Sequence, residues 1–144
     1  MLMDGQVARY DTFDDLCRYP HGSASVSGLM ICSIVGLQDP AALPFAADLG
    51  LAMQLTNFLR DIGEDARFGR IYLPLDGLAL CKLTPADLLA EQQSLAFRAL
   101  MQFEIARARR LYAAAWPGIA LLAPDSRFGV AAAATVYQGI LTKI

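Results

Sequence analysis

Two acidic side chains, Asp61 and Asp65, stand four residues apart and are the residues of this sequence best suited to chemistry. An α-helix turns by about 100° per residue, so a helix here would place both of them on one stripe with Gln54 and Asn57. Carboxylate and amide oxygens suit Mg²⁺, which proteins often share with substrate phosphates. The spacing therefore indicates Mg²⁺-dependent chemistry on a diphosphate.

Four residues, Gln54, Asn57, Asp61 and Asp65, form what we call the acidic stripe. The residues next to it indicate that the stripe faces a cavity and not bulk water. A polar stripe on a surface helix normally lies opposite the apolar face. Here it borders apolar side chains, which are Leu51, Phe58 and Ile62. Phosphate oxygens could be bound by nearby arginines, which are Arg60, Arg67 and Arg70. The alternative is a solvated helix face held by charge pairs at i,i+4 spacing.

The acidic segment resembles the second aspartate-rich motif of the squalene/phytoene synthase family, most closely in its phytoene synthase branch. The matching residues run as Gln54-x-x-Asn57-x-x-Arg60-Asp61-x-x-Glu64-Asp65-x-x-x-Gly69-Arg70-x-Tyr72-Leu73-Pro74. The resemblance implies an all-α isoprenoid synthase fold and head-to-head condensation of two prenyl diphosphates. The implied reaction converts geranylgeranyl diphosphate to phytoene through prephytoene diphosphate, in carotenoid biosynthesis.

The resemblance also implies roles for individual residues. The metal ligands would be Asn57, Asp61 and Asp65. The substrate would be bound by Tyr19, Gln54, Asn57, Arg60 and Arg70. The catalytic set would be Asp61, Asp65, Arg60, Tyr72 and Tyr137. Taken as isolated residues, the tyrosines would more often be core side chains with a satisfied hydroxyl, and His21 is interpreted as structural.

The cofactor implied by the family is Mg²⁺, with Mn²⁺ as an alternative, and a phytoene synthase uses no NADPH. Two other functions stay open: a squalene, dehydrosqualene or hydroxysqualene diphosphate synthase, and a non-catalytic relative that acts as an interaction protein. The expected partners are prenyl diphosphates. A net charge of −2 argues against nucleic acid. We expect a cytoplasmic location, with peripheral contact with a membrane as a further expectation.

The family carries a first aspartate-rich motif on an earlier helix, and this sequence lacks it. Asp11 and Asp15 have the right spacing, but Thr12 and Asp15 fit a helix capping box. We therefore interpret these acids as a helix start. Residues 1–144 are expected to form one partial domain, the middle to C-terminal part of a synthase and an incomplete helical bundle. Such a chain would be inactive without the missing N-terminal helices and would expose apolar surface.

Hydrophobic periodicity predicts an all-α chain. The end of a helix is expected at 1–8, with further helices at 12–35, 39–66, 84–115 and 127–144 and a single turn at 78–81. The expected N-caps are Thr12, Asp39, Thr84 and Ser126. Breaks are expected at Gly36 and at Pro117-Gly118, with a kink at Pro20.

The stretch 21–38 has no charged residue apart from His21, which raises the question of a membrane span. Its serine and glycine content favours a buried core helix instead. Three cysteines with no metal-binding spacing, Cys17, Cys32 and Cys81, are expected to be free thiols in a reducing compartment.

Overall fold

The computed structural model describes residues 10–18, 34, 36–90 and 94–144. Its helices are α1 (Phe13–Arg18), α3 (Ala42–Arg60), α4 (Ile62–Arg67), α5 (Leu75–Leu80), α6 (Pro85–Leu89), α7 (Leu95–Ala115), the 3₁₀ helix η2 (Trp116–Leu121) and α8 (Pro124–Ile140). Within this part of the chain the β-structure is one isolated bridge between Leu37 and Leu122. The all-α prediction is confirmed.

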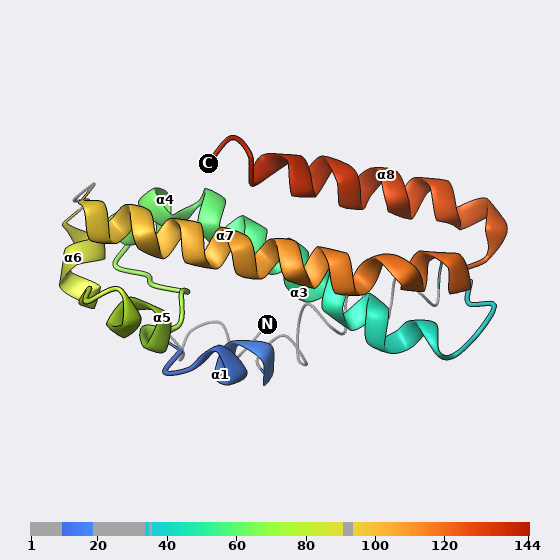
Figure 1. Cartoon of the computed structure of the whole chain (residues 1–144), viewed down its shortest axis with the longest axis horizontal. Helices are drawn as coiled ribbons and strands as arrows, with labels where there is room; N and C mark the ends of the chain where they lie inside the picture. Colours follow the sequence, from blue (N-terminus) through green and yellow to red (C-terminus); the bar gives the residue numbers. More distant parts are fainter. Residues whose placement is uncertain (1–9, 19–33, 35, 91–93) are drawn as a thin grey trace.

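Among the described elements the long helices α3 and α7 form the most extensive contact, and α8 runs antiparallel to α7 along the long axis (Figure 1). Leu55 and Leu59 of α3 and Leu100, Ala108 and Tyr112 of α7 are fully or almost fully buried. Residues at i and i+4 share a helix face, so each helix presents one continuous buried row that is mainly apolar. Burial of these rows holds the acidic stripe on a rigid element.

The turn between α7 and α8 is fixed by a close approach to α3. Pro117 ends the α-helical run, as predicted, and η2 follows. A Cβ added at Gly118 would overlap the Phe45 side chain, so only glycine fits there. Two backbone hydrogen bonds join the same region to 36–38, from Gln38 N to Leu121 O (3.1 Å) and from Ala123 N to Gly36 O (3.2 Å).

The start of α1 is tied to the start of α5. Thr12 N donates to Asp15 Oδ2 (3.0 Å) and Asp15 N donates to Thr12 Oγ1 (3.1 Å), which confirms the predicted capping box. Leu75 N donates to Tyr10 O (2.9 Å). Asp76 accepts at Oδ2 from Phe13 N (3.2 Å). This end of α1 therefore orders the loop that leads from the acidic stripe into α5.

The predicted helix at 84–115 is wrong as a single element. Thr84 caps α6 through a capping box with Asp87, but α6 ends at Leu89. A second cap, Ser94, accepts from Phe97 N (3.1 Å) and begins α7. The sequence contains two N-terminal signals within ten residues, and the second one was overlooked.

Other boundaries also differ from the prediction. The helix expected from Asp39 begins at Ala42, because Asp39 Oδ1 accepts from Ala41 N (2.8 Å) and forms a turn before the helix. Ser126 does not cap α8. That helix starts at Pro124, whose fixed φ and missing N–H suit the first helical position. The turn expected at 78–81 is the longer helix α5.

Several predictions fall on residues outside the described part. Of the helix expected at 12–35, the structure describes α1, and the helix end at 1–8 lies outside it. Cys17 and Cys81 are free thiols, and Cys32 lies outside. In the segments that are described, no helix is both long and apolar enough to cross a membrane.

Candidate diphosphate and metal site

The acidic stripe crosses a break in the helix that the sequence did not predict. Asp61 ends α3 and precedes α4, with φ −97° and ψ 6°. The backbone ladder nevertheless continues, because Asp61 N donates to Asn57 O (2.9 Å) and Asp65 N donates to Asp61 O (2.8 Å). Asn57, Asp61 and Asp65 therefore stay one turn apart, which is the register that the stripe requires.

Asp61 is held by its neighbour Arg60. The guanidinium donates from Nε to Oδ1 and from Nη2 to Oδ2, both at 2.7 Å. These charge-assisted bonds lower the pKa of Asp61, so the carboxylate is ionised at neutral pH. Arg60 also lies where it could release Asp61 and bind a diphosphate, because about half of its side chain is exposed.

Asp65 has the opposite electrostatic setting. Partial burial raises its pKa, the negative charge of Asp61 raises it further, and Arg70 opposes the shift. Arg70 follows Gly69, whose φ of 69° turns the chain, and Arg70 N donates to Asp65 O (2.9 Å). Two carboxylates that disfavour each other's charge form a site that a cation would stabilise.

Asn57 provides a direct test of whether a cation fits. Its Oδ1 is buried and has no hydrogen-bond partner among the residues that the structure describes. Buried polar atoms are nearly always paired, so such an oxygen needs an explanation, and coordination of a cation would provide one. Oxygen donors of this kind suit Mg²⁺. In the described segments no three His, Cys, Asp or Glu side chains are placed so that together they could hold a metal ion, so the stripe supplies only part of a full shell.

The predicted aromatic residues lie around the same segment. The Tyr72 ring stacks on Phe58 with centroids 4.8 Å apart and planes 10° apart. Tyr137 of α8 is half-buried against the core and close enough to Arg60 to raise its pKa. Gln54 is half-buried on α3. Tyr19 lies outside the described residues.

Two buried polar pairs were missed by the sequence analysis. Thr56 and Tyr112 share a hydrogen bond of 3.0 Å between their hydroxyls, beneath the stripe. Glu104 is fully buried and accepts from Arg107 Nη1 at both oxygens (3.0 and 3.1 Å). A signal for the second pair exists, since Glu104 stands in the i,i+4 row that also holds Leu100 and Tyr112.

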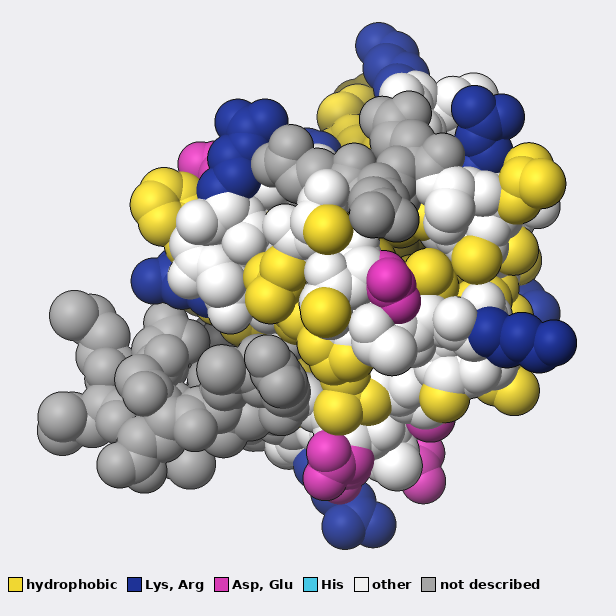
Figure 2. All heavy atoms as spheres, turned by 90° about the vertical axis from the view of Figure 1, so that its left-hand side faces the viewer, with side chains coloured by type: hydrophobic (Ala, Val, Ile, Leu, Met, Phe, Trp, Pro, Cys, Tyr) yellow, Lys and Arg dark blue, Asp and Glu magenta, His cyan; other side chains and the backbone are white. Residues whose placement is uncertain are grey.

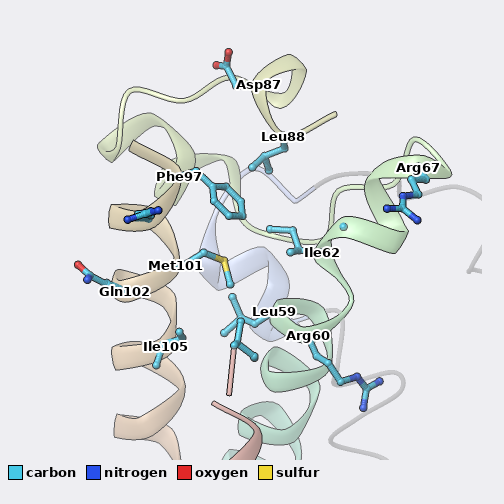
Figure 3. Close-up of a pocket in the computed structure, with 13 residues that line it drawn as sticks. Leu59, Arg60, Ile62, Arg67, Asp87, Leu88, Phe97, Met101, Gln102 and Ile105 are labelled. Atoms are coloured by element: carbon cyan, nitrogen blue, oxygen red, sulfur yellow. The ribbon is translucent and has the colours of Figure 1, made fainter. Parts of the chain in front are cut away.

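A pocket of about 620 Å³ opens on the other side of the α3–α4 segment, between α4, α6 and α7 (Figure 3). Its apolar lining comes from Leu59, Ile62, Leu88, Phe97, Met101, Ile105 and Ile144. Arginines also line it, and they are Arg60, Arg67 and Arg98. We call it the arginine pocket. It was not predicted, because it arises from segments that are distant in the sequence.

Comparison with known proteins gives one family. Residues 1–144 match the sequence model of the squalene/phytoene synthase family. A phytoene synthase of Arthrospira platensis is 46% identical, and the match covers 99% of this chain and 50% of that protein. Phytoene synthase 1 of Solanum lycopersicum, a chloroplastic protein, is 40% identical over 100% of this chain and 36% of its own length.

Solved structures give the same fold. The crystal structure of squalene synthase HpnC from Alicyclobacillus acidocaldarius superposes with a TM-score of 0.91 at 27% identity, covering 98% of this chain and 54% of that one. A dehydrosqualene synthase solved in complex with a ligand gives 0.87 at 33% identity, covering 95% and 48%. The chain thus spans about half the length, or less, of the proteins that it matches.

Proposed function

This chain belongs to the squalene/phytoene synthase family, and we propose that it serves the head-to-head condensation of two geranylgeranyl diphosphates to phytoene, through prephytoene diphosphate, in carotenoid biosynthesis. The similarity to phytoene synthases supports this product. The observation that carries the proposal is the acidic stripe itself. A buried Asn57 oxygen without a described partner lies one helical turn from Asp61, and Asp65 follows one turn later.

Asn57, Asp61 and Asp65 would hold Mg²⁺, or Mn²⁺ in its place. Bound there, the ion would neutralise charge on the leaving diphosphate. Arg60 would exchange its contact with Asp61 for diphosphate oxygens, and Arg70 would add a second guanidinium from the loop. Gln54 would orient the diphosphate by hydrogen bonding, and Tyr19 is proposed for the same task.

Tyr72 and Tyr137 would act on the organic part of the reaction. Stacking on Phe58 holds the Tyr72 ring in a fixed orientation. An aromatic face in an apolar cavity stabilises a nearby cation, and a hydroxyl can donate to an oxyanion. Tyr137, beside Arg60, is proposed to border the same cavity from α8.

The alternative products are squalene, dehydrosqualene and hydroxysqualene diphosphate. Similarity to a dehydrosqualene synthase structure keeps this alternative open. Product analysis of the synthase with C15 and C20 diphosphates, with and without NADPH, separates them. We expect phytoene from the C20 substrate and no effect of NADPH. Because the proposed substrates carry long apolar chains and the proposed product is a hydrocarbon, we also propose a cytoplasmic enzyme in peripheral contact with a membrane.

The metal role can be tested on this chain by calorimetric titration with inorganic diphosphate, with Mg²⁺ or with EDTA. We expect Asp61→Asn to weaken Mg²⁺-dependent binding by about tenfold or more, which corresponds to at least about 1.4 kcal/mol. Glu64→Gln, which changes an exposed carboxylate of the same helix, is the matched control and should bind as the parent does. Undiminished Mg²⁺-dependent binding by Asp61→Asn would refute the assignment.

A further inference from the structure

The arginine pocket lies on the side of the α3–α4 segment that faces away from the acidic stripe. Leu59, Ile62 and Gly63 line it, whereas none of the four stripe residues does. On a helix, residues 59 and 63 lie on the side opposite residues 57, 61 and 65, which follows from the 100° step. The two sites therefore share a helical segment and one side chain, Arg60, which pairs with Asp61 and also lines the pocket, while the stripe residues themselves face the other way.

The floor of the arginine pocket is apolar. The side chains of Ile62, Phe97 and Met101 point toward one another across it (Figure 3). Small-molecule sites are typically concave and apolar, with volumes of roughly 300–1,000 Å³ and a few well-placed polar groups. A cavity of about 620 Å³ with this lining suits an apolar chain.

The charged lining of the pocket is mainly basic. Arg98 lines it from α7 and makes no ion pair or side-chain hydrogen bond with another described residue, while Arg67 stands at its edge on α4 (Figure 3). The acid in the lining, Asp87, points away from the cavity and accepts from Thr84 N and Oγ1, both at 2.7 Å. Guanidinium groups bind phosphate oxygens directly, without a metal.

The surface around the pocket has the same character. Figure 2 views the end of the molecule formed by α4, α5, α6 and the start of α7, with hydrophobic side chains across its middle and Lys and Arg side chains at its margin. Large exposed apolar side chains at this end include Phe68 and Leu95, which are 69% and 85% exposed. An amphiphilic anion would meet complementary groups there.

We propose that the arginine pocket binds a prenyl phosphate or diphosphate in a metal-independent manner. The single isoprenoid chain lies on Leu59, Ile62 and Met101, and the phosphate contacts Arg98. One chain matches the cavity better than the two acyl chains of a phospholipid. This site is additional to the acidic stripe and does not depend on the metal-binding role of that stripe.

Gly63 offers a way to fill the pocket without disturbing the core. It lines the cavity from α4, and a Cβ built on it would meet nothing within 4 Å. A Gly63→Phe ring would occupy the space of the ligand chain. Gly129→Phe is the matched control, because Gly129 on α8 is equally open and lies outside the pocket.

Arg98→Glu tests the phosphate contact separately. Arg110→Glu, an exposed arginine on the same helix outside the pocket, is its charge-matched control. Both variants change a surface side chain, so they test the proposal even if Gly63→Phe does not fold. Circular dichroism melting identifies any variant that does not.

The experiment is calorimetric titration of the chain with farnesyl monophosphate in EDTA. We expect binding by the parent, a loss of about tenfold or more in Gly63→Phe and Arg98→Glu, and parental affinity in both controls. The parent should bind farnesyl monophosphate equally well in EDTA and in Mg²⁺, which distinguishes this site from the metal site. If farnesyl monophosphate does not bind in EDTA, the proposed Mg²⁺-dependent binding of diphosphate at the acidic stripe is not affected.

Two results would overturn the proposal. The first is no binding in EDTA, or binding that neither pocket variant weakens. The second comes from binding to phosphatidylglycerol vesicles. If the parent binds the vesicles but not farnesyl monophosphate, and the two pocket variants lose affinity for the vesicles, the pocket binds a lipid surface instead.

Discussion

Two acidic sites in this molecule, Glu104 and the acidic stripe, differ in how completely their side-chain oxygens are hydrogen-bonded. Glu104 is fully buried, yet both of its oxygens accept from Arg107, whose guanidinium also lies over the rings of Phe13 and Phe103 at 4.1 and 4.6 Å. The acidic stripe is more exposed. It nevertheless leaves the Asn57 oxygen without a described partner and places Asp61 beside Asp65.

This difference indicates a structural role for Glu104 and a ligand-binding role for the acidic stripe. A buried charge with a complete set of partners joins elements, and Glu104 with Arg107 joins α7 to α1 through Phe13. An incomplete set of partners weakens the folded protein and is kept where a ligand completes it. Changes in the two places should therefore move stability in opposite directions.

The largest effect is expected for Glu104→Ala. It leaves the Arg107 guanidinium, which is 15% exposed, without its carboxylate, and should lower the free energy of unfolding by about 3 kcal/mol. Urea denaturation measures it. Glu64→Ala, an exposed position, is the control and should change stability by less than about 0.5 kcal/mol. If Glu104→Ala and Glu64→Ala were equally stable, the structural role of Glu104 would be contradicted.

A smaller effect of opposite sign is expected for Asn57→Leu. Removing an unsatisfied buried oxygen while keeping the side-chain volume should raise the free energy of unfolding by about 1 kcal/mol. The same variant should lose Mg²⁺-dependent diphosphate binding. Gln102→Leu, an exposed amide on α7, controls for the added apolar surface. A destabilised Asn57→Leu variant would show that Asn57 is a structural residue.

The smallest effect concerns pH. Burial raises the pKa of Glu104 above its ordinary value of 4.5, and Arg107 only partly opposes the shift. The native chain therefore holds this proton at a pH where the unfolded chain has released it. Consequently the free energy of unfolding, taken relative to a Glu104→Gln variant, should fall as pH rises from 4.5 through the raised pKa and then stay constant. A difference that rises with pH across this range would contradict the shift.

The sequence was sufficient for the features that depend on helical period and on local capping. The register of Asn57, Asp61 and Asp65 follows from one turn of helix, and the Thr12–Asp15 box follows from two side chains. The family resemblance is confirmed by the match to the family's sequence model, and the all-α fold by the similar solved structures. The individual roles assigned to the site residues stay predictions.

The features that were missed depend on tertiary contact. The break at Asp61 falls on neither a glycine nor a proline, although Gly63 stands two residues later, and Arg60 and Asp61 pair at the break. The division of 84–115 into α6 and α7 requires a choice between two caps, Thr84 and Ser94. The arginine pocket requires three helices to meet, which no local pattern reports.

The bonds between the start of α1 and the start of α5 have a consequence for the order of folding. The hydrogen bond from Phe13 to Asp76 spans 63 residues, and its formation must close a loop of that length. Contacts within the helices close far shorter loops, so they cost less chain entropy and can form earlier in folding. We therefore expect α1 to dock after the helices α3 and α7 have formed, so that the amide protons of Leu75 and Asp76 gain protection from solvent exchange after those within α3 and α7.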